Sequence, residues 1–159
     1  MSTREGVTPA DPERAAALQL VHQLREVALR LELKATEFAR TTGLHATDVR
    51  ALIRLLDAER ARVEATPTWL AQQLGMTSQA TTAVIHRLQG AGHVERRRSA
   101  ADARSVHLMV SGPAVDLGWS FFGPLLERLI GVSEALSQDG RNTVSSYLEE
   151  VAAAVDSTE

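Results

Sequence analysis

The sequence contains no cysteine, and only 4% of its residues are aromatic. Without cysteine the chain has no disulfide, no thiolate metal site and no cysteine-based oxidant sensor. It also lacks long apolar runs, so no segment is predicted to span a membrane, and no apolar stretch near the N-terminus resembles a signal peptide. We therefore expect a soluble, cytoplasmic protein, and 159 residues suit a single domain with a proper core.

Signatures of catalysis and of metal binding are lacking as well. No glycine-rich phosphate loop occurs, and Gly118-Trp-Ser120-Phe-Phe122 lacks the closing glycine of a nucleophile elbow. The five histidines include no pair three or four residues apart, and no H-E-x-x-H motif is present. The sequence thus predicts neither an enzyme nor a metal or cofactor site.

Positive charge is scarce overall but concentrated in one segment. The net charge is −3, yet residues 82–110 carry five arginines against two acids, while residues 111–159 carry two bases against eight acids. Screening in cellular salt cuts off fields beyond roughly 8 Å, so the local sign decides whether a segment attracts phosphate. Residues 82–110 are therefore the expected site of any nucleic-acid contact.

That basic segment follows two short predicted helices joined by a glycine turn. Thr66-Pro67 starts the first helix and Gly75 ends it, and Thr77 starts the second only two residues later. The second helix buries four residues at helical spacing: Thr81, Val84, Ile85 and Leu88. Two helices joined in this way form a helix-turn-helix, whose second member can enter the major groove of DNA.

The residues after the helices predict a β-hairpin with a basic tip. Val94, Val106, Leu108 and Val110 alternate with polar residues at strand period, and arginines lie between the two strands. A helix-turn-helix with such a wing is a winged helix. The predicted DNA contacts on the second helix are Ser78, Gln79, Thr82, His86 and Arg87, and those in the wing are Arg96, Arg97, Arg98, Asp102 and Arg104. A solvated charged hairpin is the alternative interpretation of these arginines.

The segment resembles the winged-helix domain of the MarR family of bacterial transcriptional regulators. The resemblance is carried by Leu70-Ala71-Gln-Gln-Leu74-Gly75, by Gly92-His-Val94-Glu95-Arg96-Arg97 and by Asp102-Ala-Arg104. It implies that Arg104 enters the minor groove while Asp102 positions its guanidinium. Many relatives carry an arginine where this chain has Ala83, so the set of base contacts departs from theirs.

Long amphipathic helices are predicted on both sides of the winged helix. After a tail at residues 1–10, a single domain at 11–159 would contain dimerisation helices at 11–42 and 112–155 around a winged helix at 44–110. The apolar stripes of these helices are too long for one small winged helix to cover, so they predict a homodimer, as the resemblance also implies. The expected fold is mainly α with a small β-wing: a winged helix-turn-helix with long N- and C-terminal dimerisation helices.

The predicted function is a sequence-specific, ligand-responsive repressor that binds a palindromic operator in double-stranded DNA as a homodimer. The resemblance implies a small aromatic or anionic effector, and Arg25, Arg50, Trp119 and Phe122 are its candidate ligands. The two aromatic residues are more simply explained as core or dimer-interface residues. The alternative function is a dimeric winged-helix module that binds protein and has lost DNA contact, which the acidic C-terminal segment would suit.

Overall fold

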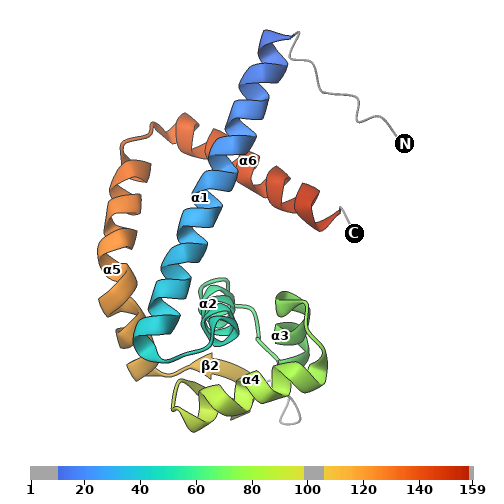
Figure 1. Ribbon diagram of the computed structural model, residues 1–159, viewed down its shortest axis with the longest axis vertical. Helices are drawn as coiled ribbons and strands as arrows, with labels where there is room; N and C mark the ends of the chain where they lie inside the picture. The colour runs from blue at the N-terminus through green and yellow to red at the C-terminus, as the bar shows by residue number, and fades with distance from the viewer. Residues whose placement is uncertain (1–10, 99–105, 158–159) are drawn as a thin grey trace. The chain divides into compact units, whose positions relative to one another are not determined.

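The computed structural model describes residues 11–98 and 106–157. In chain order the elements are α1 (Pro12–Thr42), α2 (Ala46–Arg60), α3 (Pro67–Leu74), α4 (Ser78–Gly90), β1 (Val94–Arg98), β2 (Val106–Val110), α5 (Gly112–Glu134) and α6 (Gln138–Asp156) (Figure 1). The described part is thus mainly α-helical with one small antiparallel sheet, and this confirms the predicted fold class.

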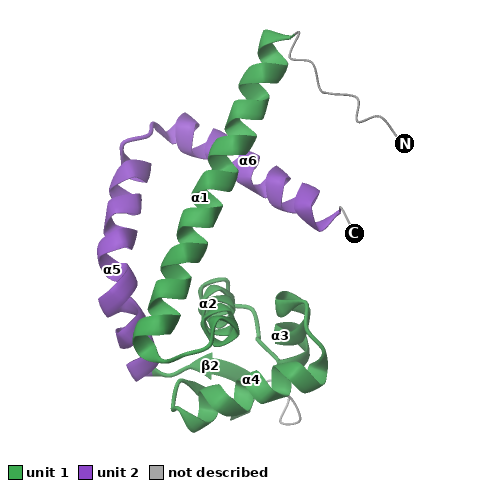
Figure 2. Ribbon diagram, in the orientation of Figure 1, with its two compact units in different colours: residues 1–111 green, residues 112–159 purple. Residues whose placement is uncertain are grey.

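The chain divides into two compact units (Figure 2). Unit 1, residues 1–111, holds α1 to α4 and the two strands, and unit 2, residues 112–159, holds α5 and α6. The helix-turn-helix and the described part of the wing therefore lie together in unit 1.

Local capping determines where the helices of unit 1 begin and end. Asp11 accepts a hydrogen bond from the Glu13 backbone at 3.0 Å and precedes Pro12, the first residue of α1. The Thr66 hydroxyl accepts from the Trp69 backbone at 3.1 Å, and the Thr77 hydroxyl accepts from the Ala80 backbone at 3.2 Å. These side chains satisfy backbone N–H groups that a helix leaves unpaired at its start, so the predicted helix starts are confirmed.

Glycine ends the helices where the backbone turns left-handed. Gly43 after α1 has φ 73° and Gly75 after α3 has φ 61°, a region where a side chain would be strained. The end of α2 breaks this rule, because Arg62 has φ 55° and is not a glycine. Because Gly75 ends α3 and Thr77 caps α4, the turn between these helices is as short as predicted and consists of Gly75, Met76 and Thr77.

The core of unit 1 is built from α2, α3, α4 and the sheet. Its largest fully buried side chains, each less than 2% exposed, include Leu70 of α3 and Thr81, Val84, Ile85 and Leu88 of α4. All four residues predicted to be buried in α4 are buried. In α2 the helical spacing of Val49, Leu52 and Ile53 predicts one buried face, and this prediction is wrong for Ile53: it is 40% exposed, whereas Leu55 is buried.

The two strands pair as an antiparallel hairpin. The register places Val94 opposite Val110 and Arg97 opposite His107. The β-branched side chain of Val63 predicts a one- or two-residue strand beside the wing, and this prediction is wrong, because residue 63 forms no strand. A backbone hydrogen bond of 2.8 Å, from the Leu108 N–H to the Ala65 carbonyl, joins the connection before α3 to β2.

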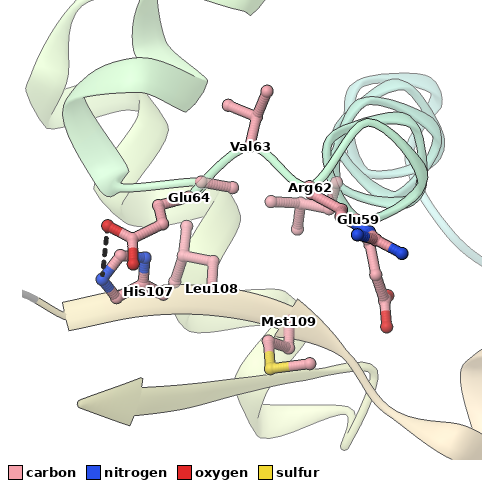
Figure 3. A pocket seen from close by; sticks show the side chains of 9 residues that line it. Glu59, Arg62, Val63, Glu64, His107, Leu108 and Met109 are labelled. Carbon is pink, nitrogen blue, oxygen red and sulfur yellow. Dashed lines mark ion pairs between the residues drawn. The ribbon is translucent and has the colours of Figure 1, made fainter. Parts of the chain in front are cut away.

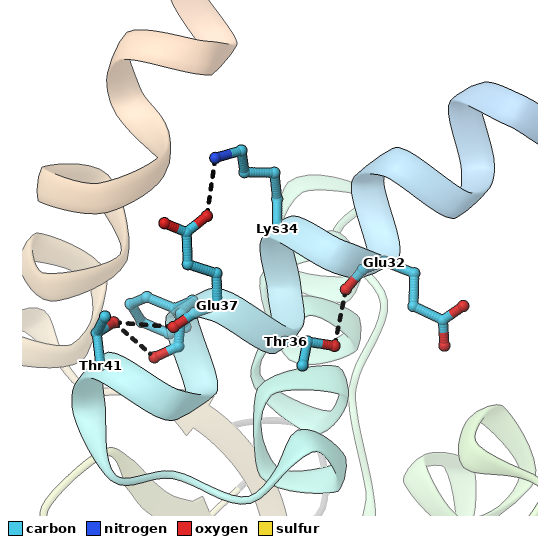
Figure 4. A network of polar contacts seen from close by, with 6 residues as sticks. Glu32, Lys34, Thr36, Glu37 and Thr41 are labelled. Atoms are coloured by element: carbon cyan, nitrogen blue, oxygen red, sulfur yellow. Dashed lines mark hydrogen bonds and ion pairs between the residues drawn. The ribbon is translucent and has the colours of Figure 1, made fainter.

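The C-terminal half of α1 is stabilised by polar contacts within the helix (Figure 4). Lys34 Nζ lies 2.8 Å from Glu37 Oε2, and the Thr36 hydroxyl donates to the Glu32 carbonyl at 3.0 Å. The Lys34 ammonium lowers the pKa of the Glu37 carboxyl through this hydrogen bond and its charge. The Thr41 hydroxyl lies within hydrogen-bond reach of the carbonyls of Glu37 and Phe38, near the end of the helix.

The long helices carry large apolar side chains that remain exposed in the single chain. Those of α1 include Leu20, Val21, Val27 and Leu31; those of α5 include Trp119, Leu126, Leu129 and Ile130; those of α6 are Val144, Leu148 and Val155. The α5 helix continues past Pro124 without ending. Among the described helices, none has the combination of length and apolar character needed to cross a membrane.

Candidate nucleic-acid interface

One face of α4 is exposed and polar, while the other is buried in the core. Ser78, Gln79, Thr82 and His86 are all exposed, as is Ala83 between them. The opposite face holds the four buried residues of the core. The Thr82 hydroxyl donates to the Ser78 carbonyl at 2.8 Å, so its proton is used within the helix. The Gln79 side chain makes no hydrogen bond to the described residues, so its amide is available to a ligand.

The last predicted contact on α4, Arg87, is held by a buried carboxylate. Its Nη2 donates to Asp48 Oδ1 at 2.5 Å and its Nε donates to Asp48 Oδ2 at 3.2 Å. Asp48 is only 2% exposed, whereas the Arg87 side chain is 44% exposed. The hydrogen bond to Asp48 raises the pKa of Arg87.

Asp48 is a site residue that the sequence did not reveal. It is the third residue of α2, where an acid near a helix start is ordinarily explained by the helix dipole and capping. Asp48 Oδ2 does lie 3.4 Å from the His45 backbone N–H. Its partner Arg87, however, is 39 residues away, and sequence spacing carries no signal for such a pair.

The described part of the wing presents three arginines to solvent. Arg96, Arg97 and Arg98 are consecutive in β1 and all exposed. Arg96 Nε donates to Gln89 Oε1 at 3.2 Å, which links the wing to the end of α4. Arg97 and Arg98 make no ion pair with the described residues. Asp102 and Arg104, the other predicted wing residues, lie outside the described residues.

A pocket of about 220 Å³ lies beside β2, on the edge away from β1 (Figure 3). Its lining includes Leu55 and Glu59 of α2, Arg62 and Glu64 of the connection to α3, and residues 107–109 of β2. His107 is 8% exposed and its Nε2 lies 3.5 Å from Glu64 Oε2. The residues predicted to bind an effector are not among those that line this pocket.

Comparison with known proteins agrees with this geometry. Residues 42–105 match the model of the MarR family, a range that runs from the end of α1 through the helix-turn-helix and β1 to the wing. This segment of the chain is therefore similar to the MarR family. The resemblance seen in the sequence is thereby confirmed, and among curated proteins none matches the chain.

Solved structures of MarR-type regulators share the fold. MepR of S. aureus in a DNA-binding conformation is 15% identical, with a TM-score of 0.64, over 86% of this chain and 98% of that one. The MepR–DNA complex is 14% identical, with a TM-score of 0.58, over 85% and 95% of the two chains. The transcriptional regulator Tm0710 of Thermotoga maritima is 17% identical, with a TM-score of 0.57, over 87% and 95%. At these identities the likeness shows the fold.

The predicted effector residues are divided between the two units. Arg25 and Arg50 lie in unit 1, and Trp119 and Phe122 lie in unit 2. Arg50 Nη2 is 3.2 Å from Glu32 Oε1, so this guanidinium already has a carboxylate partner. Trp119 is 55% exposed, and the Phe122 ring meets the Phe121 ring edge-on, with 4.9 Å between centroids. An effector site formed by these four residues stays a prediction.

Proposed function

We propose that this protein is a transcriptional regulator that binds double-stranded DNA through α4 and the wing. The observation that carries the proposal is the joint exposure of the polar α4 face and of three arginines on β1. Short polar side chains on such a helix can reach base edges in the major groove. Arginines beside it would neutralise phosphates and hold the helix in register.

The proposed assembly is a homodimer on an operator with two-fold symmetry. Exposed leucines, valines and isoleucines on α1, α5 and α6 favour association, because contiguous apolar surface of this kind is rarely left in water. A two-fold dimer presents two copies of α4, so its site would contain two inverted half-sites. The similarity of residues 42–105 to the MarR family favours a repressor that acts in the cytoplasm, where bacterial DNA lies.

The proposal includes release from DNA by a small aromatic or anionic effector. Its candidate ligands are Arg25, Arg50, Trp119 and Phe122, and of these the exposed indole of Trp119 offers the largest apolar surface. A carboxylate effector would share the Arg50 guanidinium with Glu32, which contacts it at Nη2 alone. Quenching of tryptophan fluorescence in wild type but not in Trp119→Phe, on titration with salicylate as a probe anion, tests this part.

Electrophoretic retardation tests the main proposal. The full chain should retard a duplex from the intergenic region upstream of its own gene, at moderate salt and in the presence of excess unrelated DNA. A triple variant in which Arg96, Arg97 and Arg98 become alanine should lose that retardation while keeping its helical circular dichroism. Failure of the folded wild-type chain to retard the upstream duplex would count against DNA binding.

A protein-binding module is the second candidate. It is favoured by the acidic residues 111–159, with two bases against eight acids, which would repel phosphate. Such a module would leave upstream DNA unshifted at moderate salt, and its dimer would be unaffected by the triple arginine variant.

A further inference from the structure

Among the described residues of unit 1, Asp48 and Arg87 form an ion pair whose carboxylate is almost fully buried, and the pair joins two helices. Asp48 lies in the first turn of α2, just after the turn from α1, whereas Arg87 lies in the last turn of α4. Asp48 is 2% exposed and accepts two hydrogen bonds from one guanidinium. A two-point contact of this kind fixes the plane of the guanidinium as well as its position.

The pair leaves much of the guanidinium available to a second anion. An arginine has five N–H donors, and Asp48 accepts from one on Nε and one on Nη2, so three remain. Those three make no hydrogen bond to the described residues, and the side chain is 44% exposed. Arg87 follows the exposed His86 directly and lies four residues after the exposed Ala83. At 100° per residue this places it at the margin of the α4 face that carries Gln79.

We propose that Asp48 is a positioning residue for DNA binding, and that it holds Arg87 as a preorganised contact to a backbone phosphate. The inference rests on the proposed function. A flexible arginine loses side-chain entropy when it binds a phosphate, and this loss weakens binding. Arg87 is already ordered by Asp48 in the folded protein, so its loss on binding is smaller. Because Arg87 and Gln79 lie on the same helix and Asp48 fixes the guanidinium, the phosphate contact is set at a fixed distance from Gln79.

The inference makes a prediction opposite to that of simple charge balance. Asp48 carries a negative charge near a helix that would face a polyanion, so its removal should strengthen DNA binding if only net charge matters. If Asp48 acts by positioning Arg87, its removal should weaken binding. The sign of the effect therefore separates the two explanations.

The experiment is a double-mutant cycle on affinity for the upstream duplex, with Asp48→Asn, Arg87→Ala and the double variant. Each phosphate contact contributes about 0.9 to the slope of log K against log salt, so loss of both Arg87 copies from a dimer should lower the slope by about 1.8. At 0.15 M salt this change in slope corresponds to an affinity about thirtyfold weaker. Asp48→Asn alone should weaken binding by about threefold or more, as the freed arginine must be ordered again. In the Arg87→Ala background, Asp48→Asn should cause no further loss.

Two controls separate positioning from charge and from stability. Glu95→Gln removes a carboxylate that is exposed on β1 and makes no ion pair with the described residues, so it should leave affinity equal or slightly stronger. Arg87→Lys keeps the positive charge but removes the planar guanidinium that Asp48 can hold at two points, so it should lose affinity. This variant tests the inference even if Asp48→Asn does not fold. Binding is compared only for variants whose circular dichroism shows a folded protein at the assay temperature.

Three results would overturn the inference while leaving the proposed function intact. These are tighter binding by Asp48→Asn, an equal loss from Asp48→Asn with and without Arg87, and an unchanged salt slope in Arg87→Ala. An equal loss in both backgrounds would mean that Asp48 matters only for stability. A wild-type chain that binds no DNA would overturn the proposed function, and this inference with it.

Discussion

Gln79 should contribute to sequence discrimination, whereas Arg97 should contribute to affinity for any DNA. Gln79 is the second residue of α4 and is exposed. Its side chain makes no hydrogen bond to the described residues, so no internal hydrogen bond must break before its amide contacts a base. Arg97 lies in β1, opposite His107, and its charge has no partner among the described residues. The two residues thus allow base reading and phosphate binding to be measured separately.

The expected magnitudes follow from these roles. A bidentate contact from glutamine to adenine discriminates by about 1–3 kcal/mol, so Gln79→Ala should lower affinity for each operator half-site by roughly 5- to 150-fold and barely change affinity for random duplex. Arg97→Ala should weaken both duplexes alike and lower the salt slope by about 1.8 for a dimer. The ratio of the two affinities should therefore fall for Gln79→Ala and hold for Arg97→Ala.

Fluorescence anisotropy with a labelled operator and a scrambled duplex, at one fixed salt concentration, measures this ratio. Gln73→Ala is a matched control, because it removes an exposed glutamine amide from α3, outside the α4 face. It should leave the ratio unchanged. Equal losses on both duplexes for Gln79→Ala would refute the assignment of Gln79 as a base-reading residue.

Three further predictions concern assembly, the wing and the core. Leu148 of α6 is 47% exposed in the single chain, so Leu148→Glu places a charge on the exposed apolar face of this helix and should convert a dimer into monomer in sedimentation at micromolar concentration. A wild-type protein that sediments as a stable 17.2 kDa monomer would contradict the dimer. Asp102→Ala should weaken operator binding in a titration although it removes a negative charge, and tighter binding would disprove the positioning of Arg104. Leu70→Ala, at a fully buried position, should cost about 2–5 kcal/mol in urea unfolding, and a loss below about 1 kcal/mol would show that this site is not packed.

Much of unit 1 could be predicted from the sequence because its signals are local. Thr66, Thr77 and Gly75 determine helix ends through contacts within three residues, and such contacts can be seen in the order of residues alone. The buried face of α4 likewise follows from helical period. The hairpin was predictable because apolar residues recur at every second position of β2.

The failures concern contacts between segments that are distant in the chain. The Asp48–Arg87 pair joins residues 39 positions apart, and an aspartate in the first turn of a helix already has a local explanation. The spacing of Ile53 from Val49 and Leu52 suits a buried face, yet Ile53 is 40% exposed and Leu55 is buried. Spacing along α2 does not reveal where α3, α4 and β2, all distant in the chain, pack against it. Val63 has strand propensity, but its backbone N–H donates to the Ala58 carbonyl at the end of α2, and residue 63 forms no strand.

Footprinting on the intergenic DNA upstream of the gene tests the central claim most directly. The account predicts one protected region with inverted half-sites whose centres are about 10 base pairs, or a multiple of that spacing, apart. Protection should disappear in the triple variant of Arg96, Arg97 and Arg98, and it should keep its position but weaken in Arg87→Ala. A folded wild-type chain that protects no part of this DNA, at salt low enough for phosphate contacts to form, would contradict the account.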